Sequence, residues 1–111
     1  MATRYLARTV AFVGWLIFRS PELLPILQEH LDDNDGEILP HVLLFRIREY
    51  IEFEFEKEGE SELVRAAVES LKAGLVDGDY ELLALIQTSF IDDISAEPHP
   101  AAALKRALRA D

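Results

Sequence analysis

The stretch DGEILPHVLLFRIREYIEFEFEKEG, residues 35–59, decides how this sequence folds. It holds a long series of large apolar side chains, with a turn signal before it and a glycine after it. Pro40 suits the first turn of a helix, where a missing N–H is tolerated, and Gly59 suits the exit. At about 100° per residue, one broad face collects Leu43, Leu44, Ile47, Tyr50, Ile51 and Phe55, with Val42 and Phe53 at its margin. We therefore expect a helix with neighbours on two sides.

A strand is the competing interpretation for the second half of this stretch. Residues 50–58 alternate apolar and acidic side chains, a pattern typical of a half-buried strand. No other segment offers an obvious partner strand, so we favour the helix. The sequence alone leaves both possibilities open.

Length and composition indicate one globular domain. The chain has 111 residues, half of them hydrophobic, which is enough for one core and too few for a second. It contains no cysteine, which excludes disulfides, thiolate metal sites and a cysteine nucleophile. Stability must therefore come from packing.

The net charge of −10 is concentrated in the middle of the chain. Residues 20–97 hold 20 acidic and 5 basic side chains, a balance of −15, whereas residues 1–19 hold three arginines and no acid. An acidic centre repels phosphate backbones and anionic membranes. We therefore expect no nucleic-acid partner and no membrane partner, but a basic protein partner.

The N-terminal residues 3–19 predict a helix that is apolar nearly all round. Such a helix is buried, either in its own core or against a second copy. No small-x-small cleavage site follows it, and its apolar run is too short to cross a bilayer. We therefore expect a cytoplasmic protein. If the helix forms a homodimer, its contact residues are Phe12, Trp15 and Phe18.

Further helices follow at short intervals. Ser20 is predicted to cap a helix that begins at Pro21 and ends near residue 31. Ser61 is predicted to cap a helix over residues 60–72, and Gly74 is expected to end it. Residues 80–94 and 101–110 predict two more, separated by Pro98 and Pro100. The expected fold is an all-α, single-domain bundle of five to six helices over residues 1–111, with its core in residues 3–94.

No catalytic or cofactor motif is present. The sequence contains no G-x-S-x-G, no phosphate-binding loop and no H-E-x-x-H. The acidic link at residues 32–36 lacks the first ligand and the final glutamate of a calcium loop. Glu37 and His41, four residues apart, form the nearest metal-like pair, which would need a further carboxylate in the same pocket. We expect no catalytic residue, no cofactor and no metal; a metal-dependent enzyme is the weakest alternative.

The acidic side chains offer the better functional signal. Glu54 and Asp93 fall on otherwise apolar helix faces, where a carboxylate needs a partner or access to water. Alternate positions from 52 to 62 are all glutamate, which ordinarily means a solvated surface, but their mutual repulsion would be relieved by a basic partner. The predicted partner-binding residues are Glu52, Glu54, Glu56, Glu58, Tyr50, Phe53, Asp92 and Asp93, with Tyr80 as a further candidate anchor.

Two short stretches also carry a resemblance. E-I-L-P-H at residues 37–41 and S-F-I-D-D-I at residues 89–94 resemble the signature stretches of a family of small, uncharacterised bacterial α-helical proteins. The resemblance covers residues 21–94 and departs at Leu44, Phe45 and Arg46, where the family pattern has small or acidic residues. That family is similar to small acidic domains encoded near bacterial toxins. The resemblance therefore implies an immunity-like or adaptor role, and a structural homodimeric module is the alternative.

Overall fold

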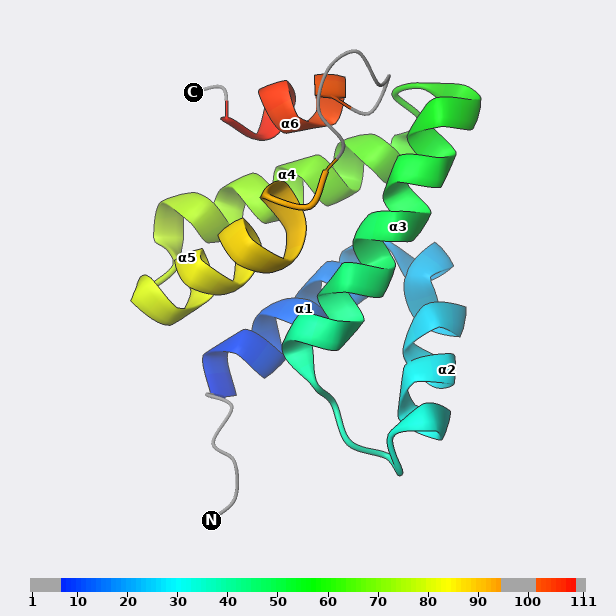
Figure 1. The fold of residues 1–111 in the computed structure, drawn as a ribbon, viewed down its shortest axis with the longest axis vertical. Coiled ribbons are helices and arrows are strands. Elements are labelled where there is room, and N and C mark those ends of the chain that lie inside the picture. The colour runs from blue at the N-terminus through cyan, green and yellow to red at the C-terminus, as the bar shows by residue number, and fades with distance from the viewer. Residues whose placement is uncertain (1–6, 95–101, 110–111) are drawn as a thin grey trace.

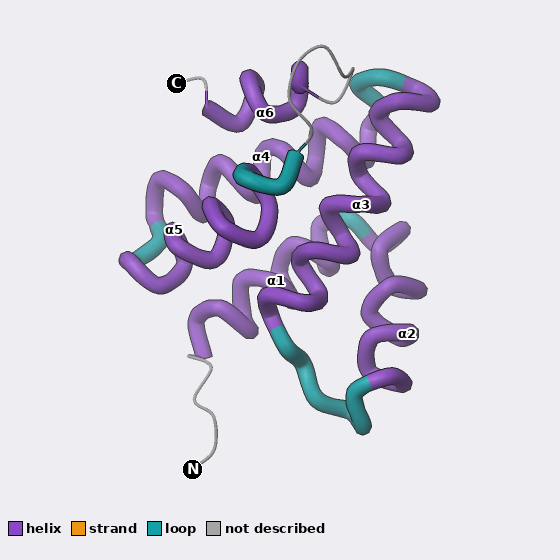
Figure 2. Tube along the Cα trace, in the orientation of Figure 1, coloured by secondary structure: helices purple, strands orange, loops and turns teal. Residues whose placement is uncertain are grey.

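A computed structural model describes residues 7–94 and 102–109, and all of its regular elements are helical (Figure 1). In chain order these are α1 (Ala7–Arg19), the 3-10 turn η1 (Pro21–Leu23), α2 (Leu24–Asp33), α3 (Pro40–Glu58), α4 (Glu62–Asp77), α5 (Tyr80–Ile86), the π-helical η2 (Gln87–Ile91) and α6 (Ala102–Arg109). No strand occurs within the described ranges (Figure 2). The predicted all-α bundle is confirmed.

Helix α3 lies at the centre of this bundle. Its inner face carries Leu43, Leu44, Ile47 and Ile51, each with no exposed surface. The helix contacts α1, α2, α4, α5 and η2, so it does have neighbours on two sides. Pro40 occupies the first turn, and Gly59 leaves the helix with a φ of +67°. Residues 50–58 are helical, which settles the helix-or-strand question.

Helix α1 packs across α4 and α5 with one face only. Phe12, Val13, Leu16 and Ile17 are buried there, whereas the opposite face of the helix is exposed. The predicted helix is therefore confirmed from Ala7 onward, and residues 3–6 of that prediction lie outside the described residues. Of the described helices, none is by itself long and apolar enough to cross a bilayer; α1 and the segment Pro21–Asp33 reach that length and composition only as a pair bent by 112°.

The start of the second helix differs from the prediction. The Ser20 hydroxyl accepts no hydrogen bond from the helix, and its oxygen is buried without a partner. The reason is that Ser20 still belongs to the exit of α1: its N–H donates to the carbonyls of Leu16 and Ile17. One 3-10 turn follows, and α2 then runs to Asp33, two residues beyond the predicted end.

The prediction for α4 was right at its start and wrong at its end. The Ser61 hydroxyl accepts from the Val64 N–H at 3.3 Å, as a cap should. Gly74, however, lies inside the helix, which continues to Asp77. A Cβ at Gly74 would approach Phe12 to 2.7 Å and Ile86 to 2.8 Å. This glycine therefore permits close packing of α4 on α1 and α5 and does not end the helix.

The helix predicted over residues 80–94 ends earlier than expected, at Ile91. Helix α5 continues after Ile86 as the π-helical segment η2. The wider π-helical turn is seen in the hydrogen bond that the Asp92 N–H donates to the Gln87 carbonyl, five residues earlier. The Thr88 hydroxyl bonds to the Ala84 carbonyl at 2.8 Å and so competes for an acceptor of the α-helical ladder. Helix α6 runs from Ala102 to Arg109 and packs on α4. Pro98 and Pro100 lie outside the described residues.

Candidate protein-interaction site

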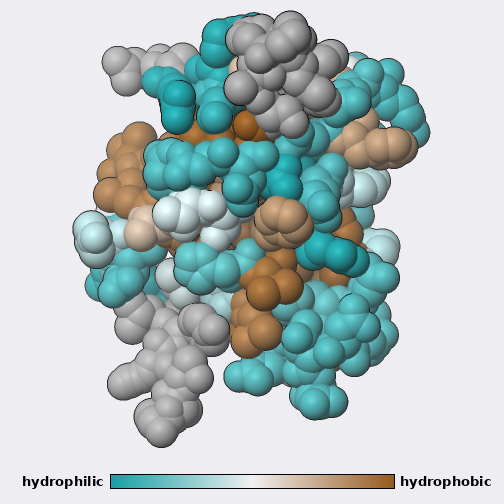
Figure 3. Space-filling model, viewed as in Figure 1, coloured by the Kyte–Doolittle hydropathy of each residue, from teal (hydrophilic) through white to brown (hydrophobic). Residues whose placement is uncertain are grey.

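The outer face of α3 is an exposed surface that combines apolar and acidic side chains. Val42, Phe45 and Phe53 are 48%, 39% and 59% exposed, and the exposed Glu49 and Glu56 lie among them on the same side of the helix. The exposed Arg46 lies beside them and is paired with Glu29 of α2 at 3.5 Å. Figure 3 shows apolar surface along the course of α3, bordered by hydrophilic side chains. We call Val42, Phe45, Glu49, Phe53 and Glu56 the α3 outer face. Large exposed aromatic side chains within a polar surround are typical of protein-binding surfaces.

A buried ion pair supports this face from one side. Arg48 donates to the Glu52 carboxylate one turn along α3, and both side chains are only 9% exposed. The Arg48 guanidinium also stacks on the Phe45 ring, 4.6 Å from its centroid. The prediction that Glu52 contributes to an exposed acidic ladder is therefore wrong, because its side chain points into the bundle and is paired with Arg48. The ion pair instead holds Phe45 in place.

Tyr50 and Glu54 form the other border of the α3 outer face. Both are half-buried, and the Tyr50 hydroxyl is hydrogen-bonded to the Glu54 carboxylate. Burial, together with the nearby charges of Glu54 and Glu22, raises the pKa of Tyr50 above its ordinary value. Glu54 thus has the partner that a carboxylate on an apolar face requires, and only part of it is accessible to a binding protein.

The acidic character is strongest at the C-terminal end of α3. Glu56 and Glu58 are exposed, and Glu60 and Glu62 continue the acidic surface through the turn into α4. Lys57 is the one basic residue in the part of α3 that follows Arg48. Its ammonium lies 4.0 Å from the Glu54 carboxylate and 5.6 Å from the Phe53 ring centroid. The exposed ring of Phe53 therefore lies near the ammonium of Lys57 in a segment that holds more glutamates than basic residues.

Asp92 and Asp93 lie in the turn after η2, the segment that packs against α3. Both are exposed, so Asp93 meets the requirement for access to water. The Gln87 side chain donates to the Asp92 carboxylate at 2.6 Å. These two acids are thus exposed carboxylates in the turn that follows a segment packed on α3.

Glu37 and His41 do not form a metal pair. Glu37 is exposed in the link before α3, and since the helix begins only at Pro40 the two residues do not share a helical face. His41 instead contacts the Ser89 hydroxyl through Nδ1 at 2.5 Å, which joins the start of α3 to η2. Within residues 7–94 and 102–109 no three potential ligands gather into a metal site.

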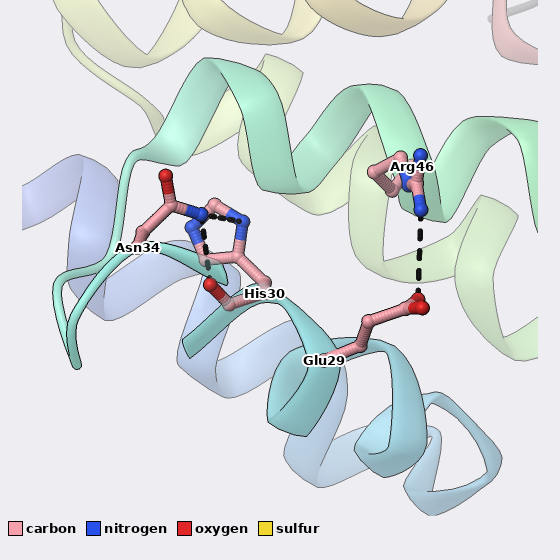
Figure 4. A network of polar contacts seen from close by, with 4 residues as sticks. All are labelled: Glu29, His30, Asn34 and Arg46. Atoms are coloured by element: carbon pink, nitrogen blue, oxygen red, sulfur yellow. Dashed lines mark hydrogen bonds and ion pairs between the residues drawn. The ribbon is translucent and has the colours of Figure 1, made fainter. Parts of the chain in front are cut away.

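His30 carries the buried polar network that the sequence did not predict (Figure 4). Its Nε2 accepts a hydrogen bond from the Leu39 N–H at 3.0 Å, and its Nδ1 lies 3.4 Å from the Asn34 side chain. Burial lowers the pKa of His30, opposed by the charge of Asp33 and reinforced by that of Arg46. His30 thus ties α2 to the residue that precedes α3, and it positions the start of that helix.

The three predicted dimer residues do not share one environment. Phe12 is 7% exposed and belongs to the bundle's own core, so it presents little surface to a second copy. Trp15 and Phe18 are 38% and 79% exposed on the outer side of α1. The centroid of the Trp15 ring lies 6.0 Å from the centroid of the Phe12 ring and 5.3 Å from the guanidinium carbon of Arg19.

Sequence reasoning missed Phe45, Arg48 and the true position of Val42. The recurrence of apolar residues at 42, 45 and 53 follows helical spacing and could have indicated a second apolar stripe. The Arg48 and Glu52 spacing of four could likewise have indicated an ion pair. The burial of that pair depends on the neighbouring helices, which the local pattern does not reveal.

No family model, curated protein or solved structure matches this chain. The resemblance to small bacterial α-helical proteins therefore stays a prediction.

Proposed function

We propose that this chain is a small acidic protein-binding domain of the cytoplasm that binds a basic protein through the α3 outer face, and that it works as an immunity-like protein without catalysing a reaction. The observation that carries the proposal is the exposure of Phe45 and Phe53 on a helix whose solvent side is rich in carboxylates. Aromatic side chains supply affinity, and surrounding charge steers association.

The arrangement of the surface supports a rigid binding site. Phe45 is held by the stacked Arg48, and Phe53 projects from the same helix two turns later. A preformed helical face loses little conformational entropy when it binds. The net charge of −10 favours encounter with a cationic surface, and this contribution weakens as salt screens the charges.

The first experiment is affinity capture from the native cell, followed by kinetics with the purified captured protein. We expect a basic protein that is retained at low salt and released at high salt. Reversal of Glu49 and Glu56 to lysine should slow its association several-fold. The matched control reverses Asp32 and Glu81, two exposed acids on α2 and α5, and changes the net charge by the same amount.

Phe53→Ala tests the apolar anchor separately. We expect faster dissociation and an affinity loss of about 1–2 kcal/mol, or roughly 5- to 30-fold in Kd. For an immunity role, co-expression of this chain should restore growth to cells that produce the captured protein, and Phe53→Asp should abolish that protection. Equal kinetics for the α3 variants and the control pair would reject the α3 outer face as the binding site.

A further inference from the structure

The outer side of α1 is a second exposed apolar surface, and it differs from the α3 outer face in charge. Its exposed residues are Ala7, Ala11, Gly14, Trp15 and Phe18. The helix contains no acidic residue. Its two arginines are already paired, Arg8 with Asp79 at 2.8 Å and Arg19 with Glu69 at 3.6 Å. We call the five apolar residues the α1 outer face.

A groove borders the N-terminal half of this face. It has a volume of 420 Å³ and lies between α1 and the turn that joins α4 to α5. Ala11, Phe12, Trp15 and Leu82 supply its apolar walls, and the exposed Asp77 and the Arg8–Asp79 ion pair line it as well. The groove is open to solvent, is wide enough for an aromatic ring, and presents apolar surface that water solvates poorly.

We propose that the α1 outer face binds a second copy of this chain in a two-fold symmetric dimer. Two molecules that each carry a charge of −10 repel one another over most of their surfaces. The five residues of the α1 outer face carry no charge, and the neighbouring carboxylates of Asp79 and Glu69 are each paired with an arginine of α1. Two copies that meet through this face therefore add less repulsion than two copies that meet through the glutamates of α3. A basic partner, by contrast, would meet Arg8 and Arg19 beside this face and so gains less here than at the glutamates of α3.

The spacing along α1 suits an antiparallel pair of helices. Phe18 lies seven residues beyond Ala11, about 10 Å along the axis at 1.5 Å per residue. A two-fold axis near Gly14 and Trp15 places Phe18 of each copy beside Ala11 of the other, at the groove. Both aromatic side chains then leave water in one isologous contact. Gly14 lies at the crossing point, where the absence of a side chain lets the helices approach closely.

Dimerisation through α1 does not depend on the proposed basic partner. Both helices bury their inner faces in one core, so the α1 outer face and the α3 outer face point away from that core in different directions. The dimer would therefore leave both α3 outer faces available.

The test uses sedimentation velocity over a wide concentration range, together with the emission of Trp15, the single tryptophan. We expect twice the monomer mass at high concentration and a red shift of the emission on dilution. Phe18→Asp and Gly14→Glu should each raise the dimer dissociation constant at least about tenfold. Phe53→Asp, an equally drastic change at an exposed aromatic residue of α3, should leave dimerisation unchanged.

Folding of the variants is checked by circular dichroism and thermal unfolding. A Cβ at Gly14 meets no atom within 4 Å, and glutamate forms helix better than glycine, so Gly14→Glu should keep or raise the melting temperature of the monomer while dimerisation is lost. A wild-type protein that stays monomeric at every concentration overturns the proposal. So does a dimer that persists in both α1 variants, or one that Phe53→Asp dissociates equally.

Discussion

Helices α1 and α3 share one core but present very different outer surfaces. Each buries one face, with Phe12, Val13, Leu16 and Ile17 on α1 facing inward like their counterparts on α3. The solvent side of α1 is apolar and free of carboxylates, whereas that of α3 mixes aromatic residues with glutamates. The core requires only the inner faces, so folding alone does not explain the difference between the outer faces.

The largest expected effect on stability concerns the buried ion pair between Arg48 and Glu52 of α3, because α1 buries no charged residue. Glu52→Ala removes one partner of the buried Arg48 pair, which should lower the free energy of unfolding by about 3–5 kcal/mol. Glu29→Ala, which breaks the exposed Arg46 pair, should cost less than about 1 kcal/mol. Urea denaturation measures both changes.

The double variant Arg48→Met with Glu52→Leu sharpens this prediction. Replacing both charges by apolar side chains should recover most of the lost stability, because no uncompensated charge then stays buried. If Glu52→Ala and Glu29→Ala cost the same, the Arg48–Glu52 pair does not differ from a surface pair, and the contrast between the two helices weakens.

Two glycines give an intermediate effect of opposite sign. Gly74→Ala places a methyl group within 3 Å of Phe12 and Ile86, on the inner side of α1, and should destabilise the protein by about 1–3 kcal/mol. Gly14→Ala, on the outer side of α1, meets no atom within 4 Å and should stabilise it by up to about 1 kcal/mol. Thermal unfolding at low protein concentration compares the two. Equal signs would show that one side of α1 is not the free surface described above.

The smallest effect is a pH dependence that arises where α2 meets the start of α3. The folded pKa of His30 lies below its ordinary value of 6.5, chiefly through burial, so the unfolded chain binds the extra proton more readily. This contribution to stability is complete above pH 6.5 and is lost as the pH falls through the folded pKa. A second proton would also occupy Nε2 and remove the hydrogen bond from Leu39.

Thermal unfolding between about pH 7.5 and 5.5 brackets the ordinary histidine range. The melting temperature of the wild-type protein should fall with pH, and His30→Asn should flatten that fall. His41→Asn, a control at another histidine of the α3 region, should retain it. Identical slopes in the wild type and His30→Asn would assign the pH dependence to other groups.

The sequence predicted the helices better than their ends. Pro40, Gly59 and Ser61 act as local signals, because a proline, a glycine and a capping hydroxyl work within one turn of the backbone. Gly74 misled the prediction because a glycine that ends a helix and a glycine that lets helices approach are identical in sequence. Ser20 misled the prediction because its backbone N–H bonds to carbonyls of α1, so the residue ends that helix and does not cap the next one.

The candidate site was only partly predictable for a related reason. Phe53, Glu56 and Glu58 were expected at an exposed surface and are exposed. Phe12 and Glu52 were expected there too, and both are buried. Each lies on its helix at an angle that could face solvent or a neighbour. Phe12 packs beside Gly74 of α4, whereas Glu52 is buried together with Arg48 of its own helix.

By itself, the sequence determined that this protein is an all-α domain with an acidic middle and a helix at its centre, because periodicity, capping residues and net charge act locally or additively. Only the tertiary structure decided which charges are buried in pairs, which aromatic residues stay exposed, and where His30 anchors α3. Those outcomes depend on helix packing, in which residues far apart in the chain compete to cover the same surface.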